Sequence, residues 1–306
     1  MRVGVDLGGS KLEVAVVDLD ADAGRCDILL RERQPTHQEE GYDAIVARVA
    51  SSLRAACEER NLDVARVPIG VGMPGGVERR GGHVKNSNTT CLNGRPFRAD
   101  LERALGRRLA FENDANCFAL AEATFGAARA HREGLVFGVI MGTGVGGGLV
   151  FGGRVWGGPQ GIAGEWGHHG VFAGRSDARA CYCGERGCLE AYASGPAVER
   201  HFVELGGAPQ SATEIAALGA SGDAVARAAI ASLIEAFGRG LANVIDICDP
   251  SAIVLGGGLS KLDLLYGEGR EETARRVFND ELTTPILRPT LGDSAGVIGA
   301  ALVARS

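Results

Sequence analysis

The sequence of 306 residues has no excess of positive charge. Lys and Arg total 32 against 38 Asp and Glu, so the formal net charge at pH 7 is −6. Without a basic field the chain has no general attraction for nucleic acid or anionic lipid, and we expect no nucleic-acid partner. A small anionic ligand would require a local binding site.

Long apolar runs are also missing. Residues 136–141 form one of the longest, far short of the roughly 20 residues that span a membrane. Asp6 interrupts the N-terminal segment before the apolar core of a signal peptide can develop. These absences predict a cytoplasmic protein with no membrane partner.

Glycine is over-represented, at 47 of the 306 residues, about twice the usual frequency of roughly 7%. The glycines fall in clusters, which favours turns lined by backbone rather than flexible linkers. Strand-like and helix-like segments alternate around them, and this alternation predicts an α/β fold. Helices are expected at 41–60, 98–105, 113–125, 224–246 and 292–304, and strands at 67–71, 108–111 and 251–255.

The pattern of apolar strand, glycine-rich turn and apolar strand occurs twice, at 3–17 and at 135–151. Such a repeat is typical of a duplicated fold with two domains. The first turn contains a carboxylate suited to a magnesium shell, backbone N–H groups, a hydroxyl and a cation: Asp6, Gly8, Gly9, Ser10 and Lys11. It is neither a Walker A loop nor a dinucleotide-binding fingerprint.

A plain hairpin would explain the first turn taken alone. The second turn, with Gly142, Thr143 and Gly144, favours instead two elements that hold one polyphosphate. A third cluster, Gly256, Gly257 and Gly258, follows an apolar strand. It is either a contact point for adenine or ribose or a simple turn into a helix.

Asp114 is the candidate general base. It lies in the run Glu112–Asn116, where a helix is expected to begin, and a helix N-terminus orients a carboxylate and keeps it ionised. The alternative is a simple N-cap. Transfer of a phosphoryl group requires mainly positioning and charge stabilisation, so a weak base suffices.

Three of the eight cysteines crowd into one short segment. Cys181, Cys183 and Cys188, with His168 or its neighbour His169, supply the four ligands of a closed tetrahedral zinc site, which is structural rather than catalytic. Glu165 and Glu190 flank these ligands. A bound zinc would fix both carboxylates, which suits the hydroxyls of a polyol, although surface acids are the ordinary interpretation.

Five motifs in this order resemble the ROK family (repressors, open reading frames and kinases): the DxGG[ST]K start, ENDANC at 112–117, GTGVGGG at 142–148, ExGH ending at His168, and CxCGxxGCxE ending at Glu190. The resemblance implies an actin-like ATPase fold, which is ribonuclease H-like and hexokinase-type, with two α/β domains around a cleft. The expected domains are 1–116 with the helix 292–306, and 117–291 with a zinc lobe at 165–190. It also implies ATP, Mg²⁺ and a homodimer.

The same resemblance assigns roles to individual residues. Asp114 matches the catalytic base and Asn113 a sugar ligand beside it. His168 matches a sugar ligand that also binds zinc, and Asp6 belongs to the first phosphate element. Further matches to the sugar pocket are Gly75, Asn88, Glu165 and Glu190, and matches to the phosphate elements are Gly8 to Lys11 and Gly142 to Gly144.

Residues 84–94 and 163–168 most resemble bacterial fructokinases and manno-fructokinases, so fructose is the expected sugar. N-acetylglucosamine or N-acetylmannosamine is the alternative. Two positions depart from the fructokinase pattern: Ser10 replaces a commoner Thr, and Cys91 stands where Trp is frequent. Two other functions are considered for this sequence. A sugar-responsive repressor would need a helix-turn-helix for binding DNA. A zinc hydrolase would need an open coordination position on the zinc, which the four predicted ligands do not leave.

Overall fold

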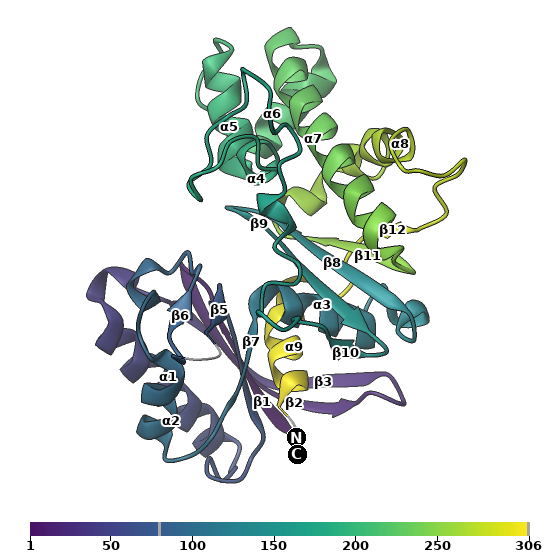
Figure 1. Ribbon diagram of the computed structural model, residues 1–306. Helices are drawn as coiled ribbons and strands as arrows, with labels where there is room; N and C mark the ends of the chain where they lie inside the picture. The colour runs from purple at the N-terminus through teal and green to yellow at the C-terminus, as the bar shows by residue number, and fades with distance from the viewer. Residues whose placement is uncertain (79–80, 305–306) are drawn as a thin grey trace. The chain divides into compact units, whose positions relative to one another are not determined.

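The computed structural model describes residues 1–78 and 81–304, which form two compact units (Figure 1). The first unit comprises Met1–Arg132, Gly148–Ala163 and Thr290–Ser306, and the second Glu133–Gly147 and Gly164–Pro289. The boundary expected from the sequence placed residues 117–132 in the second domain. The structure groups them with the first unit, because helix α3 (Asp114–Thr124) packs along the C-terminal helix α9 (Ala295–Val303).

The first unit contains a five-stranded sheet of order β3-β2-β1-β4-β7. Strands β1 and β2 pair antiparallel, as expected for the first hairpin, whereas β4 is parallel to both β1 and β7. The strands are β1 (Arg2–Leu7), β2 (Lys11–Asp20), β3 (Arg25–Pro35), β4 (Ile69–Met73) and β7 (Ala110–Asn113). The sequence did not predict β3, an edge strand with many charged residues.

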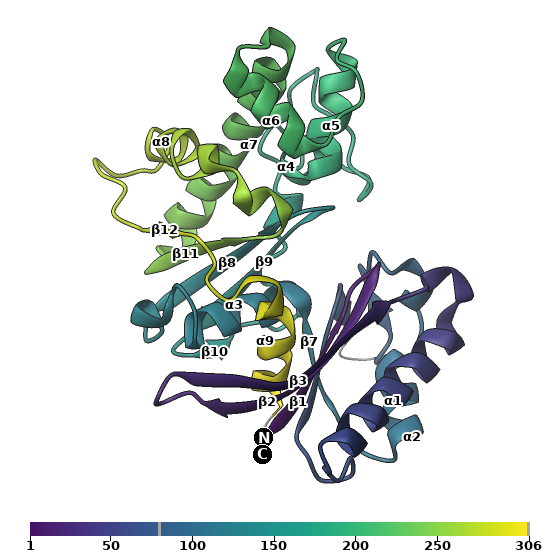
Figure 2. The same ribbon diagram turned by 180° about the vertical axis from the view of Figure 1, so that it is seen from behind.

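Both faces of this sheet are covered by helices. Helices α1 (Tyr42–Glu59) and α2 (Phe97–Leu105) lie on one face and α9 on the other (Figures 1 and 2). Alternate residues of β2 point to the two faces, since Val14 and Val16 join the core beneath α1 while Ala15 and Val17 pack with α9. A further strand pair of this unit is β5 (Gly76–Val77) with β6 (Val84–Lys85).

The second sheet has the order β10-β9-β8-β11-β12. Strands β8 and β11 run parallel, and β8 and β9 form the second expected hairpin. Strand β10 and the end of β9 from Gly148 belong to the first unit. The strands are β8 (Leu135–Met141), β9 (Val145–Phe151), β10 (Arg154–Val155), β11 (Ala252–Gly256) and β12 (Ile286–Leu287).

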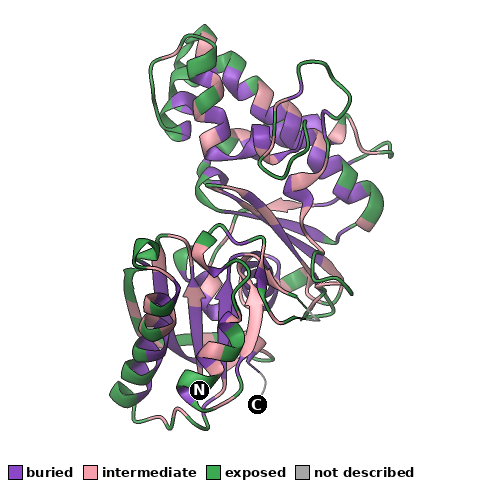
Figure 3. Cartoon of the chain, turned by 60° about the vertical axis from the view of Figure 1, so that its left-hand side comes forward, coloured by how far each residue is buried: buried purple, intermediate pink, exposed green. Residues whose placement is uncertain are grey.

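Helix α7 (Ala224–Cys248) organises the helical part of the second unit. It contacts α4 (Glu190–Ala193), α5 (Gly195–Glu204), α6 (Ala212–Ser221) and α8 (Glu268–Ala274). Its 25 residues are long and apolar enough to cross a membrane, contrary to the expectation from the sequence. However, 67% of its apolar window is buried inside the protein, as the purple faces of the packed helices in Figure 3 illustrate, so α7 has the character of a core helix.

Candidate active site

The turn between β1 and β2 carries the first predicted phosphate element. The Gly8 amide donates to the Lys11 carbonyl at 2.8 Å, which closes the turn. A β-carbon on Gly9 would lie 3.6 Å from Asn88 Oδ1 and 3.8 Å from Thr89 Oγ1. The fold therefore brings the predicted sugar ligand Asn88 next to the predicted phosphate turn, although almost eighty residues separate them in the chain.

Asp6, at the end of β1, lies in a crowded and strongly charged position. Burial, followed by the charges of Asp114 and Glu13, raises its pKa from 3.8 to about 7, against the opposing charges of Lys11 and Arg33. A β-carbon at position 296 of α9 would lie 2.4 Å from Asp6 Oδ2, so Gly296 is required for this close approach. Asp6 thus lies in the electrostatic field of the predicted base.

Asn113, not Asp114, caps helix α3. Its side-chain oxygen accepts hydrogen bonds from the Ala115 and Asn116 amides at 2.9 and 3.3 Å. Asp114 is the first helical residue and its Oδ1 accepts from the Ala115 amide at 2.9 Å. The capping role considered for Asp114 is therefore filled by its neighbour, and Asp114 is held at the first position of the helix.

Three further hydrogen bonds connect the parts of this region. Asn113 Nδ2 donates to the Gly75 carbonyl at 3.0 Å, and Glu112 Oε1 accepts from the Asn113 amide and from Asn116 Nδ2, both at 2.9 Å. In the first unit the structure therefore brings Asp6, Gly9, Gly75, Asn88, Asn113 and Asp114 into one region. Glu112 and Gly296, which the sequence analysis did not assign, support it.

The second hairpin and the third glycine cluster also meet. The Gly142 amide donates to the Gly144 carbonyl at 2.9 Å within the turn, and a β-carbon on Gly142 would lie 3.8 Å from the Gly258 nitrogen. Glu190 Oε2 accepts from the Val145 amide at 2.7 Å. The predicted sugar ligand Glu190 is therefore tied to the predicted second phosphate turn, a contact that sequence spacing does not reveal.

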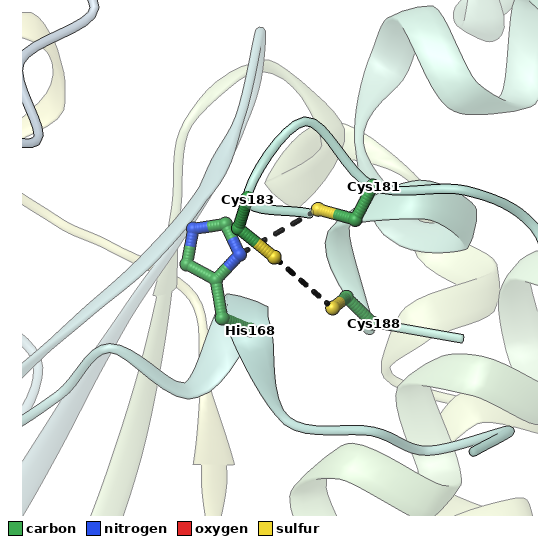
Figure 4. A group of neighbouring side chains, drawn as sticks. All are labelled: His168, Cys181, Cys183 and Cys188. Atoms are coloured by element: carbon green, nitrogen blue, oxygen red, sulfur yellow. Dashed lines mark hydrogen bonds between the residues drawn. The ribbon is translucent and has the colours of Figure 1, made fainter. Parts of the chain in front are cut away.

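The predicted metal ligands form one cluster (Figure 4). The Nδ1 of His168 lies 3.6 Å from Cys181 Sγ, and Cys183 Sγ lies 3.6 Å from Cys188 Sγ. Bonds of about 2.3 Å to sulfur and about 2.0 Å to nitrogen place tetrahedral ligand atoms roughly 3.5 to 3.8 Å apart. The donor set and its spacing therefore fit zinc, and the sulfurs are too far apart for a disulfide.

The structure also decides between the two histidines. His168 joins the thiols, whereas His169 is absent from the cluster and its pKa is lowered by burial. Beside the cluster lies Tyr182, another residue that the sequence analysis did not assign. Partial desolvation of its hydroxyl and then the charges of Glu190, Cys181 and Glu165 raise its pKa to about 12, so the two predicted sugar-binding carboxylates lie near this tyrosine.

Two α/β units that each carry a glycine-rich hairpin beside fixed carboxylates define a phosphotransferase of the actin-like, hexokinase-type fold. The chain belongs to the ROK family, whose profile matches residues 2–306, and it is a sugar kinase. It is 34% identical over 310 residues to an N-acetyl-D-glucosamine kinase of Photobacterium profundum, with 99% of each chain covered.

Two solved structures extend the comparison. The ROK hexokinase from Thermus thermophilus is 35% identical, with a TM-score of 0.85 over 99% of this chain and 97% of that one. A ROK family glucokinase from Streptomyces griseus in complex with glucose and AMPPNP is 30% identical, with a TM-score of 0.78 over 99% of both chains. The phosphorylated substrate of this kinase is a hexose.

Asp6→Asn is expected to change how stability depends on pH. A carboxyl whose native pKa is raised binds more protons in the folded state, so its contribution to stability falls as pH rises from about 4 to about 7. The neutral amide avoids this loss and should be more stable at pH 8 by a few kcal/mol, at about 1.4 kcal/mol per pKa unit. Urea unfolding between pH 5 and 8, without nucleotide or metal, measures the difference. An advantage of the variant that does not grow with pH would contradict the raised pKa.

Proposed function

We propose that this kinase transfers the terminal phosphoryl group of ATP to a hydroxyl of N-acetylglucosamine. The observation that carries the proposal is the 34% identity to an N-acetyl-D-glucosamine kinase over 99% of both chains. The loop resemblance that predicted fructose covers only 84–94 and 163–168, whereas this likeness covers the whole sequence, so the comparisons favour the alternative sugar. The similarity to a hexokinase keeps an unmodified hexose as the second candidate.

In the proposed mechanism Asp114 accepts the proton of the attacking sugar hydroxyl while the oxygen bonds to the γ-phosphorus and the bond to the β-phosphate oxygen breaks. Its place in the first turn of α3 fixes the carboxylate, and the hydrogen bond from Asn113 to Gly75 fixes the neighbouring sugar ligand. Because phosphoryl transfer is largely dissociative, proton removal is late and the main contribution is orientation of the hydroxyl.

The glycine-rich turns supply the phosphate contacts in this proposal. Gly8 to Lys11 in the first unit, and Gly142, Thr143 and Gly144 in the second, are each assigned to phosphate binding through their backbone N–H groups. Gly256 to Gly258, next to the second turn, are assigned to the nucleoside. A bound Mg²⁺ would offset the negative charge on the phosphates, and Asp6 is the residue that would hold it.

We assign zinc to His168, Cys181, Cys183 and Cys188 as a structural ion. The set leaves no open position for catalysis, and the segment that carries it, residues 164–189, has little regular structure to hold it in shape. Bound zinc would fix the ends of this segment, where the proposed sugar ligands Glu165 and Glu190 lie. Homodimerisation and cytoplasmic location stay predictions from the sequence.

The sugar assignment is tested by steady-state kinetics with saturating ATP and magnesium. The panel is N-acetylglucosamine, N-acetylmannosamine, N-acetylgalactosamine, glucose, mannose and fructose. We expect the highest kcat/KM with N-acetylglucosamine, by at least tenfold over fructose, because a site built for the acetamido group leaves polar groups unpaired with other sugars. A higher kcat/KM with fructose would overturn the assignment and restore the fructokinase interpretation.

Asp114→Asn should lower kcat by about 100- to 10,000-fold, because the amide retains the shape but cannot accept the proton. The sugar Kd, measured by calorimetry without nucleotide, should change little. Asp43→Asn removes a carboxylate that is 94% exposed in the same unit and serves as the control. A kcat for Asp114→Asn within about threefold of the unmodified enzyme would place the base elsewhere.

Cys183→Ser is expected to abolish stoichiometric zinc and to raise the sugar KM, since the ligand set loses one thiolate. Metal content by mass spectrometry and sugar kinetics measure both effects. Cys248→Ser, which removes a cysteine outside the cluster in the same unit, should retain the zinc. Full activity of the zinc-free variant would show that the ion does not support the sugar site.

A further inference from the structure

Tyr182 stands between two of the metal-ligand cysteines and is not buried. Its side chain is 81% exposed, so it adds almost nothing to a hydrophobic core. The loop is closed without it, because the Cys181 amide donates to the Glu185 carbonyl at 2.9 Å and the Gly184 amide to the Cys181 carbonyl at 3.1 Å. An exposed aromatic residue is unremarkable by itself, so its specific contacts decide its role.

The tyrosine contacts the outer side of the predicted sugar-binding histidine. Its hydroxyl lies 3.2 Å from Nε2 of His168, and the two rings meet edge to face with centroids 5.3 Å apart and an interplanar angle of 86°. The other ring nitrogen, Nδ1, points at Cys181 Sγ within the metal cluster. Because Nδ1 is directed into the proposed metal site, Nε2 is the ring nitrogen of His168 that is left to bind a sugar hydroxyl. The Tyr182 hydroxyl lies next to this Nε2 atom.

The surroundings of Tyr182 match the composition of a carbohydrate site. The carboxylates of Glu165 and Glu190 act electrostatically on its hydroxyl, so all three sugar ligands proposed in the second unit lie near this side chain. Sugars present hydroxyls around a ring whose faces carry C–H groups. An aromatic side chain with an accessible face packs against such C–H groups while neighbouring polar side chains pair with the hydroxyls.

We propose that Tyr182 is a sugar-binding residue that determines affinity for the acceptor. Its ring forms a wall that packs against the C–H face of the hexose. Before the sugar binds, its hydroxyl lies beside Nε2 of His168, at the place that a sugar hydroxyl takes on binding. The inference rests on the proposed sugar-kinase site, and it adds a specific contact. The loop that carries Cys181 and Cys183 would then contact the sugar directly, in addition to holding the proposed zinc.

Kinetics of two substitutions separate the ring from the hydroxyl. Tyr182→Ala removes the wall and should raise the KM for N-acetylglucosamine about tenfold, since aromatic contacts of this kind contribute up to about a factor of ten. The kcat and the KM for ATP should stay within about twofold, because the proposed base and phosphate turns are untouched. Tyr182→Phe retains the ring, and its sugar KM should stay within about threefold of the unmodified enzyme.

Arg186→Ala is the matched control. Arg186 is exposed in the same loop, whereas the described side-chain contacts of His168 are with Cys181 and Tyr182. Removal of the Arg186 side chain therefore perturbs the loop without touching the sugar wall. Zinc content is measured for every variant. An unchanged sugar KM in zinc-loaded Tyr182→Ala, or an equal rise in Arg186→Ala, would overturn the proposal.

A spectroscopic measurement covers the case in which Tyr182→Ala loses its metal. The protein contains four tyrosines, so labelling with 3-fluorotyrosine gives few ¹⁹F signals, and Tyr182→Phe identifies the signal of residue 182. Titration with N-acetylglucosamine, without nucleotide, should shift that signal with the Kd found by calorimetry. Sugar binding that leaves the signal unmoved contradicts the proposal, whereas an enzyme that neither binds nor phosphorylates any sugar of the panel contradicts the proposed function itself.

Discussion

The close approach of helix α9 to the first sheet is the constraint on which the first unit depends. A β-carbon on Gly4 of β1 would lie 2.0 Å from the Val297 carbonyl oxygen, and one on Gly70 of β4 would lie 1.9 Å from that of Ala300. Only glycine fits such spacing, and at this distance the helix buries Val297 and Ala301 completely. The last helix of the chain is thus part of the core around its first strand.

That packing also sets the electrostatics of the site. Gly296 presses against the Asp6 carboxylate, and α3 lies along α9 with Asp114 at its first position. Two carboxylates are thereby held in each other's field, and the pKa of Asp6 rises to about 7. Lys11 and Arg33 offset part of this repulsion, while the buried Glu13 restrains both cations through ion pairs. The arrangement reduces stability near neutral pH, and a bound cation would relieve the repulsion.

In the second unit, the segment that carries the predicted metal ligands has little regular secondary structure. The four predicted metal ligands lie together there, and Glu190 accepts a hydrogen bond from the Val145 amide of the second turn. This hydrogen bond therefore connects a proposed sugar ligand, Glu190, to a proposed phosphate element. Tyr182 projects from the same loop beside His168. A single irregular segment, held by a metal, would position groups for the sugar and for the phosphates.

Local patterns in the sequence determined a large part of this description. Apolar runs broken by glycine predicted both hairpins, and the helix expected at 41–60 is α1, since strand and helix periodicities are properties of neighbouring residues. The cysteine spacing likewise identified the cluster at Cys181, Cys183 and Cys188. The charged edge strand β3 was missed because it shows no clean alternation of apolar and polar residues.

Only the tertiary structure decided the contacts between distant residues. It selected His168 over His169, gave the capping role to Asn113, and brought Asn88 beside Gly9. It also grouped α3 with the first unit through α9 and placed Tyr182 on His168 Nε2. A sequence specifies which groups are available and their local order. The distances between groups far apart in the chain follow from how helices and strands pack, and these distances decide which side chains meet.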